Sequence, residues 1–158
     1  YGAEVILYGN SYSEAFSEAK RLSEIESRTF IDGFNDRWII SGQGTIGLEI
    51  LEAHPDVQNV IIPVGGGGLI SGIAKAIKSE KPDVRIIGVQ SENCDSVVES
   101  VRKGEYTVSS KGFTIADGIS VQNPGKLNIE MIRKYVDELV TVSDELMAYA
   151  LFKLLEKA

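Results

Sequence analysis

The chain has 158 residues, of which 43% are hydrophobic and 25% are charged, a composition typical of a globular domain with an apolar core. Its formal charge of −7 makes nucleic acid and anionic membranes poor partners. No apolar run approaches the roughly 20 residues that cross a bilayer, and the single cysteine, Cys94, excludes an internal disulfide and is typical of a cytoplasmic protein.

The first part of the chain alternates between predicted strands and helices. Residues 3–9 (AEVILYG) are a short apolar strand candidate. A helix follows, because Ser11 and Glu14 have the spacing of a capping box and apolar residues then recur at helical spacing. Residues 28–34 (RTFIDGF) predict a second strand. The next helix, residues 41–53, is apolar on most sides and contains three glycines, so we expect it to be buried in close contact with another element.

The middle of the chain continues this alternation. Residues 57–64 (VQNVIIPV) are nearly all apolar and predict a central parallel strand that is covered on both faces. The inward face of the helix that follows is formed by Leu69, Ile70, Ile73, Ala74 and Ile77. Further strands are predicted at residues 84–89 and 137–142, with a weaker helix at residues 95–102 and a long functional loop at residues 104–125.

The last helix completes the predicted fold. It begins after Ser143, a favourable N-cap residue. We expect it to bury an apolar stripe formed by Leu146, Ala150, Leu151, Leu154 and Leu155. The alternation as a whole predicts an α/β fold: a doubly wound, mainly parallel five-stranded sheet with helices on both faces, flavodoxin-like or Rossmann-like. In such sheets, ligands bind beyond the carboxyl ends of the strands.

Four consecutive glycines, Gly65 to Gly68, lie at such an end, between the strand at residues 57–64 and the next helix. The unpaired N–H groups of a first helical turn attract anions, and glycine lets the backbone approach them without a Cβ atom. We therefore expect a phosphate or a similar anion here, since a plain tight turn would need only one or two glycines. A P-loop lysine is missing, and the last glycine of a dinucleotide fingerprint would fall on Ile70 or Ser71, so a nucleotide is disfavoured.

The segment IPVGGGGLISGIA resembles the phosphate loop of fold-type II pyridoxal-phosphate enzymes, above all threonine dehydratases (threonine deaminases) and serine racemases. Five more segments resemble the family in the same order: YGAEVILYG, ISGQGTIGLEILE, KPDVRIIGVQ, FTIADGISV and DELVTVSDEL. The resemblance implies one α/β domain over residues 1–158. Within it, residues 1–40 resemble the end of the family's small domain, and residues 41–158 resemble part of the large cofactor domain.

The resemblance also implies a cofactor, pyridoxal 5′-phosphate, and a set of residues that bind it. The cofactor phosphate would be bound by the backbone N–H groups of Gly65, Gly66, Gly67, Gly68 and Leu69. The family's Ala-Asp-Gly segment, which here ends at Gly118, would run beside the pyridine ring, although a surface turn would explain it too. Some members hold a divalent cation on a Glu and an Asp. Gln90 and Ser96 stand at those places here, so no metal site is expected.

The family's catalytic segments are missing from this sequence. No Ser-Phe-Lys-x-Arg-Gly-Ala-type segment supplies the lysine that forms the Schiff base with the cofactor. Lys75 and Lys78 are poor substitutes, because they fall on the outward face of their predicted helix. The Ser-x-Gly-Asn-His-type and late Ser-Gly-Gly segments are absent as well. The chain is therefore expected to be an internal fragment with no catalytic residue, inactive alone, in which binding of the cofactor is weak or absent.

The function implied for the parent enzyme is β-elimination from L-threonine or L-serine, which gives ammonia with 2-oxobutanoate or pyruvate. Two alternatives stay open: a self-standing flavodoxin-like module that binds an anion without catalysis, and a fragment of a serine racemase. The expected partner is a small-molecule cofactor, phosphate or sulfate, and neither nucleic acid nor a membrane. A homodimer also stays open, because a fragment would expose apolar patches.

Overall fold

A computed structural model describes residues 2–109 and 112–157. The chain divides into two compact units, Tyr1–Asp32 and Gly33–Ala158. The boundary implied by the resemblance, between residues 40 and 41, stays a prediction. Among the described residues, no helix is long and apolar enough to cross a bilayer.

The first unit contains helix α1 (Tyr12–Ile25). The helix begins as predicted at Ser11, whose side chain accepts the N–H of Glu14 at 3.3 Å. The carboxylate of Glu14 accepts the N–H of Asn10, at 2.7 Å, so the second half of the capping box is displaced by one residue. No residue of Tyr12–Ile25 is buried.

Two predicted strands, residues 3–9 and 28–34, are wrong. Neither segment pairs with a strand in the described part of the chain. The apolar side chains of the first segment are exposed, with Val5 at 79% and Leu7 at 91%. An apolar run becomes a strand only where a neighbouring strand supplies hydrogen bonds, and sequence pattern alone does not reveal that neighbour.

The sheet of the second unit contains three parallel strands in the described residues, and not five as predicted. They are β1 (Asn59–Pro63), β2 (Arg85–Ser91) and β3 (Glu138–Val142), in the order β1-β2-β3. The α/β class and the parallel pairing are confirmed. The strand predicted to be central, β1, lies instead at an edge of this sheet, and its residues alternate between exposed and buried.

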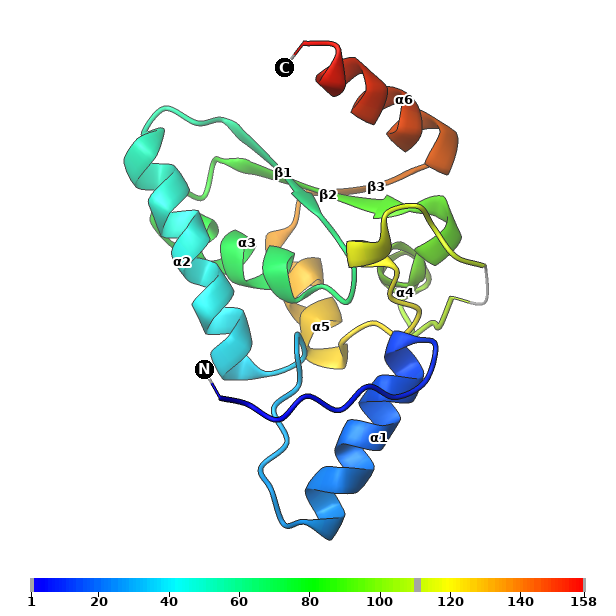
Figure 1. Ribbon diagram of the computed structural model, residues 1–158. Coiled ribbons are helices and arrows are strands. Elements are labelled where there is room, and N and C mark those ends of the chain that lie inside the picture. Colours follow the sequence, from blue (N-terminus) through cyan, green and yellow to red (C-terminus); the bar gives the residue numbers. More distant parts are fainter. Residues whose placement is uncertain (1, 110–111, 158) are drawn as a thin grey trace. The chain divides into compact units, whose positions relative to one another are not determined.

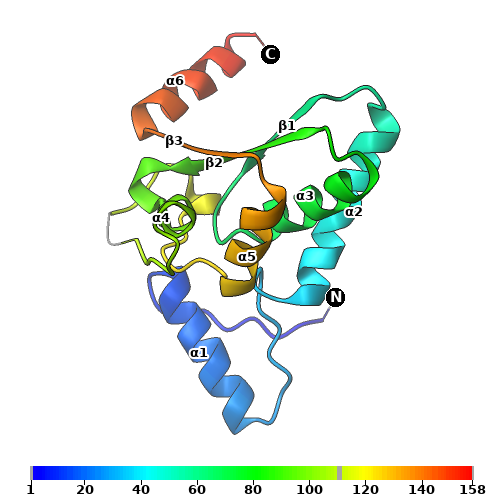
Figure 2. The same ribbon diagram turned by 180° about the vertical axis from the view of Figure 1, so that it is seen from behind.

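The helices of this unit lie on both faces of the sheet (Figures 1 and 2). One face is covered by α3 (Gly68–Glu80), α4 (Ser96–Lys103) and α5 (Lys126–Tyr135), and α2 (Arg37–Ala53) packs on α3. Helix α6 (Asp144–Leu155) lies on the opposite face. The sequence analysis predicted no element where α5 lies; the N-cap of this helix is Gly125, which offers no side-chain cap.

The core lies between the sheet and α3, α4 and α5. Its fully buried members come from all of these elements: Ile70, Ile77, Ile86, Val97 and Ile132. Burying each such side chain contributes about 1.5–3 kcal/mol. The inward face predicted for α3 is confirmed for Ile70, Ile73, Ala74 and Ile77, and Leu69 is half-buried.

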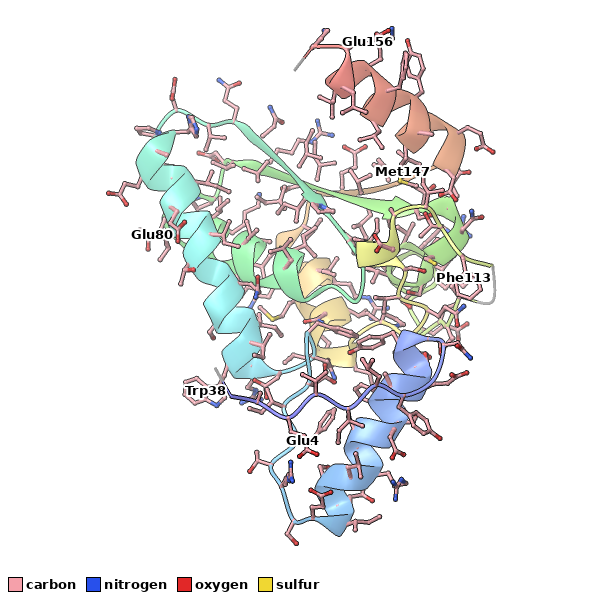
Figure 3. The ribbon with its side chains drawn as sticks, in the orientation of Figure 1. Glu4, Trp38, Glu80, Phe113, Met147 and Glu156 are labelled. Carbon is pink, nitrogen blue, oxygen red and sulfur yellow. The ribbon has the colours of Figure 1, made fainter. Side chains whose placement is uncertain are left out.

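Glycines allow α2 and α3 to approach each other closely. A Cβ atom at Gly72 would fall on the carbonyl oxygen of Ile40, and one at Gly47 would lie 3.0 Å from the carbonyl oxygen of Ile73. The predicted close contact of this helix is confirmed. Its burial is limited to one face, however, since Leu48 is 50% exposed. At the start of α2, before the predicted range, Trp38 also projects outward with 85% of its surface exposed (Figure 3).

Helix α6 begins where the sequence predicts, but the predicted burial of its apolar face is not observed. The hydroxyl of Ser143 accepts the N–H of Leu146 at 3.3 Å, as expected of an N-cap. The predicted buried stripe is wrong, because all five of its residues are exposed; they are Leu146, Ala150, Leu151, Leu154 and Leu155. An apolar stripe shows only that a helix can bury one face, and the described residues leave this face open.

Candidate functional site

The glycine loop joins β1 to α3 at the carboxyl end of the sheet. Before the loop, Val64 donates its N–H to the carbonyl oxygen of Val89 at 2.8 Å and is fully buried. At the other end, Gly67 is the N-cap of α3 with φ of 95°, in the left-handed region that glycine adopts without strain. The loop is therefore held between the first two strands and a helix N-terminus.

Three of the four glycines, Gly66 to Gly68, are also required by the packing of the chain itself. A Cβ atom at Gly66 would fall on the ring of Phe34, and one at Gly68 would lie 2.8 Å from the backbone oxygen of Phe34. One at Gly67 would lie 2.9 Å from Cβ of Asn128. The expectation that packing alone would need only one or two glycines is therefore wrong. The chain's own atoms occupy the space beside them.

The carbonyl groups of the loop are bound by the protein. That of Gly65 accepts a hydrogen bond from Nε2 of Gln90 at 3.2 Å. That of Gly66 accepts two at 3.0 Å, from the N–H of Gly125 and from Nδ2 of Asn128. The carbonyl of Gly67 accepts the N–H of Ser71, the first backbone bond of α3.

The N–H groups of the loop are not bound in this way. Within residues 2–109 and 112–157, no acceptor receives the N–H of Gly65, Gly66 or Gly67. Gly68 and Leu69 follow in the first turn of α3, where N–H groups have no partner within the helix. Gly66 to Gly68 are buried, and buried N–H groups without a partner are rare in proteins. This arrangement suits an anionic acceptor supplied from outside the chain.

The structure brings the Ala-Asp-Gly segment close to this loop. Ala116 is the N-cap of the short helix η2 (Asp117–Ile119), which contains Asp117 and Gly118, and a Cβ atom at Gly65 would lie 3.2 Å from Cα of Ile119. No described atom lies within 4 Å of the position of a Cβ at Gly118, so this residue faces open space. An open apolar pocket lies there, lined by Ile61, Pro63, Val89, Ala116, Gly118, Ile119, Val142 and Met147. Of these, Met147 comes from the first turns of α6 (Figure 3).

The carboxylate of Asp144 binds the two residues just before the Ala-Asp-Gly segment, a contact that the sequence did not reveal. It accepts the hydroxyl of Thr114 at 2.6 Å and the N–H of Ile115 at 3.1 Å. The hydrogen bond from Thr114 is the main reason why the pKa of Asp144 lies below its ordinary value. An acid in the first turn of a helix is favoured by the dipole in any case, so its sequence position gave no sign of this second contact.

The two residues at the family's metal positions bind protein groups. Oε1 of Gln90 accepts the N–H groups of Val97 and Val98, at 3.2 and 3.1 Å, and so caps α4. The hydroxyl of Ser96 donates to the carbonyl of Val121 at 3.3 Å. No group of three or more His, Cys, Asp or Glu gathers among the described residues. That this protein has no metal site stays a prediction.

The two lysines considered as substitutes for a catalytic lysine have other contacts. Nζ of Lys75 lies 4.8 Å from the ring centre of Tyr135. Nζ of Lys78 lies 2.8 Å from the carboxylate of Asp137. Neither contact involves the glycine loop, and no catalytic residue is assigned in this chain.

Fold and loop together define a class of protein: an α/β protein in which a glycine turn after a parallel strand presents unpaired N–H groups at a helix N-terminus. The family described as pyridoxal-phosphate-dependent enzymes matches residues 1–158, and the chain belongs to this family. The resemblance to fold-type II enzymes of the threonine dehydratase and serine racemase kind is thereby confirmed.

Relatives with assigned activities are similar to nearly all of this chain. An L-threonine ammonia-lyase of Thermotoga maritima is 52% identical over 157 residues, which are 99% of this chain and 39% of that protein. A catabolic L-threonine dehydratase of Escherichia coli is 45% identical over 99% of this chain and 48% of that protein. The chain thus spans 39% to 48% of the length of these two relatives.

Solved structures show the same fold. The processed form of threonine deaminase isoform 2 from Solanum lycopersicum superposes with a TM-score of 0.85 at 39% identity, over 90% of this chain and 41% of that one. Maize serine racemase superposes with a TM-score of 0.86 at 33% identity, over 95% of this chain and 45% of that one.

Proposed function

We propose that this chain is the phosphate-binding part of a pyridoxal-phosphate-dependent dehydratase (ammonia-lyase) that acts on L-threonine or L-serine. The cofactor phosphate is bound by the N–H groups of Gly65, Gly66, Gly67, Gly68 and Leu69. The observation that carries this proposal is the run of loop N–H groups without a protein acceptor, at the N-terminus of a helix of 13 residues. A doubly charged phosphate ester satisfies such donors and the helix dipole together.

The pyridine ring of the cofactor lies beside Gly118 in this proposal. The open apolar pocket beside η2 and the approach of Ile119 to Gly65 support it, since a flat aromatic ring needs an apolar surface within reach of its phosphate. The hydrogen bonds that Asp144 accepts from Thr114 and Ile115 fix the two residues that directly precede Ala116 in the wall of the pocket.

When bound, pyridoxal phosphate supplies an electron sink for cleavage of bonds at the substrate Cα. In the parent enzyme this chemistry releases ammonia from threonine or serine with 2-oxobutanoate or pyruvate. This chain contributes binding and orientation. A lysine that holds the cofactor and moves the Cα proton is not found in its sequence. The chain alone is therefore inactive and binds the cofactor through the phosphate.

The wider setting is part of the same proposal. Residues 1–40 end the small domain and residues 41–158 belong to the large cofactor domain of a longer enzyme. In that longer enzyme, we infer, the second unit forms part of a doubly wound, flavodoxin-like sheet, with α3 and α6 on opposite faces. The compartment is the cytoplasm, which the single cysteine supports, and the exposed apolar residues of α6 favour a homodimer of the isolated chain.

Two other functions share this site. A self-standing module that binds phosphate or sulfate without catalysis is favoured by the missing lysine segment. A serine racemase fragment is favoured by the likeness to the maize enzyme. Neither alternative changes the role of the loop, because each uses the same unpaired N–H groups.

A ligand titration followed by two-dimensional ¹H–¹⁵N spectra tests the proposal. Pyridoxal phosphate and inorganic phosphate are expected to shift the amide signals of Gly65 to Gly68, while pyridoxal without phosphate leaves them in place. Gly42, on the exposed side of α2, is the control signal. Loop signals unmoved by both phosphate compounds would refute the site, and ammonia release from threonine at a family-like rate would refute the inactivity of the chain.

A further inference from the structure

Two buried carboxamides from later elements of the chain bind the glycine loop. Gln90, in β2, and Asn128, in α5, are both 0% exposed. Nε2 of Gln90 donates to the carbonyl of Gly65, and Nδ2 of Asn128 donates to the carbonyl of Gly66. A peptide plane carries its C=O and the next N–H on opposite sides, so holding these carbonyls also orients the N–H groups that follow them.

The orientation of each amide is determined by its surroundings. Nδ2 of Asn128 donates to two carbonyl oxygens, of Phe34 at 2.9 Å and of Gly66 at 3.0 Å. Its Oδ1 is buried and meets no donor in the described part of the chain. Turning the amide over would place this oxygen against both carbonyls. Gln90 is oriented in the same way, because its Oε1 accepts two N–H groups from α4 and leaves Nε2 for Gly65.

We infer that Gln90 and Asn128 are positioning residues of the anion site. They bind no ligand themselves. They hold the carbonyls of Gly65 and Gly66, so that the N–H groups of Gly66 and Gly67 stay ordered and available to an external acceptor. The inference rests on the proposed function for the identity of that acceptor, a phosphate group, but not for the order of the loop.

The two substitutions at Gln90 separate the loop contact from the cap of α4. Gln90→Glu keeps an acceptor for the N–H groups of Val97 and Val98 and loses the donor to Gly65, while adding a charge. Gln90→Met loses the donor and the cap without adding a charge. Loss of the donor is the only change that both share. Asn128→Leu removes the donors to Phe34 and Gly66, and Gln58→Met, at an exposed position, is the matched control.

The first measurement uses the 158-residue chain without ligand. The order parameters of the backbone N–H groups of Gly66 and Gly67 are expected to be about 0.85 in the parent sequence. They are expected to fall to about 0.6 in each of the three variants, Gln90→Glu, Gln90→Met and Asn128→Leu. Gln58→Met is expected to leave them unchanged. A loop that stays equally ordered in all three variants, in a chain that circular dichroism shows to be folded, would overturn the inference.

The second measurement is the affinity for inorganic phosphate and for pyridoxal phosphate. Each of the three variants is expected to weaken both about tenfold, the effect of about 1.4 kcal/mol lost from one oriented hydrogen bond. Weaker binding only in Gln90→Glu would assign the effect to charge and overturn the positioning role of Gln90. If the parent chain binds neither compound, the proposed function fails, while the order parameters still decide whether the two amides position the loop.

Discussion

At the scale of single residues, the side chain of Asp144 shows how one carboxylate can serve two elements. It is the first residue of α6, and it also accepts hydrogen bonds from the hydroxyl of Thr114 and the N–H of Ile115, which directly precede Ala116 in the wall of the apolar pocket. Nδ2 of Asn93 donates to it as well, at 3.4 Å. These donors stabilise the ionised form, so protonation weakens the attachment of this wall to α6.

The stability of the chain should therefore depend on Asp144 in acid. The pKa of Asp144 is lower in the folded chain than in the unfolded chain, mainly because of the hydrogen bond from Thr114. Its contribution is complete above the unfolded value and is lost as the pH falls through the folded value. We expect Asp144→Asn to lower the urea midpoint at pH 7 and to lower it less at pH 3.

Urea unfolding at a series of pH values, followed by circular dichroism, measures this difference. Glu145→Gln, which changes the neighbouring exposed acid of the same helical turn, is the control. A midpoint difference between Asp144→Asn and the parent chain that is equal at pH 7 and pH 3 would contradict the assignment.

At the scale of elements, the packing of α2 on α3 depends on missing side chains. Gly44 and Gly47 are the buried glycines of α2, and Gly72 faces them from α3. Since no Cβ atoms intervene, backbone atoms of the two helices come into direct contact. Glycine is unfavourable within a helix by about 1 kcal/mol relative to alanine, so this close contact must compensate for a cost at each of these positions.

Two matched substitutions test this contact. Gly72→Ala places a methyl group on the carbonyl oxygen of Ile40 and is expected to lower the free energy of unfolding by about 1–3 kcal/mol. Gly42→Ala, on the exposed side of α2 with no described atom within 4 Å of its Cβ position, is expected to raise it by up to about 1 kcal/mol. Chemical denaturation measures both. If the two substitutions changed the free energy of unfolding equally, helix propensity alone would explain both, and the contact between α2 and α3 would play no part.

The sequence predicted the elements better than the contacts between them. The glycine loop, α3 and the N-cap of α6 follow from local patterns, and the structure contains them. The contacts of Gln90 with Gly65, of Asn128 with Gly66 and of Asp144 with Ile115 join positions 25, 62 and 29 residues apart. No local pattern encodes such contacts, since they depend on the order of the strands.

At the scale of the whole chain, the two compact units differ in how much they bury. Helix α1, in the unit Tyr1–Asp32, has no buried residue between Tyr12 and Ile25. In the unit Gly33–Ala158, Ile77 and Ile86 are 0% exposed. Because local stability follows the burial of apolar side chains, the first unit should open at a lower cost in free energy than the second.

Amide hydrogen exchange should reveal this difference. We expect the amides of α1 to exchange through local opening, with an opening free energy of about 0–2 kcal/mol. For the amides of β2 and α3, the opening free energy should approach that of global unfolding, about 5–15 kcal/mol. Mass spectrometry of peptic fragments resolves the two regions. Exchange in α1 as slow as in α3 would contradict the prediction and would show that the first unit is as stable as the second.

The parallel register of the sheet has a consequence for how this chain acquires its structure. Asn59 pairs with Arg85, and Ile87 pairs with Glu138, so neither strand pair can form as a hairpin. Each pairing must close a long stretch of polypeptide before it gains any hydrogen bond, and topologies of this kind fold slowly. During synthesis, β3 leaves the ribosome after the other two strands, and until it arrives one edge of β2 has no partner.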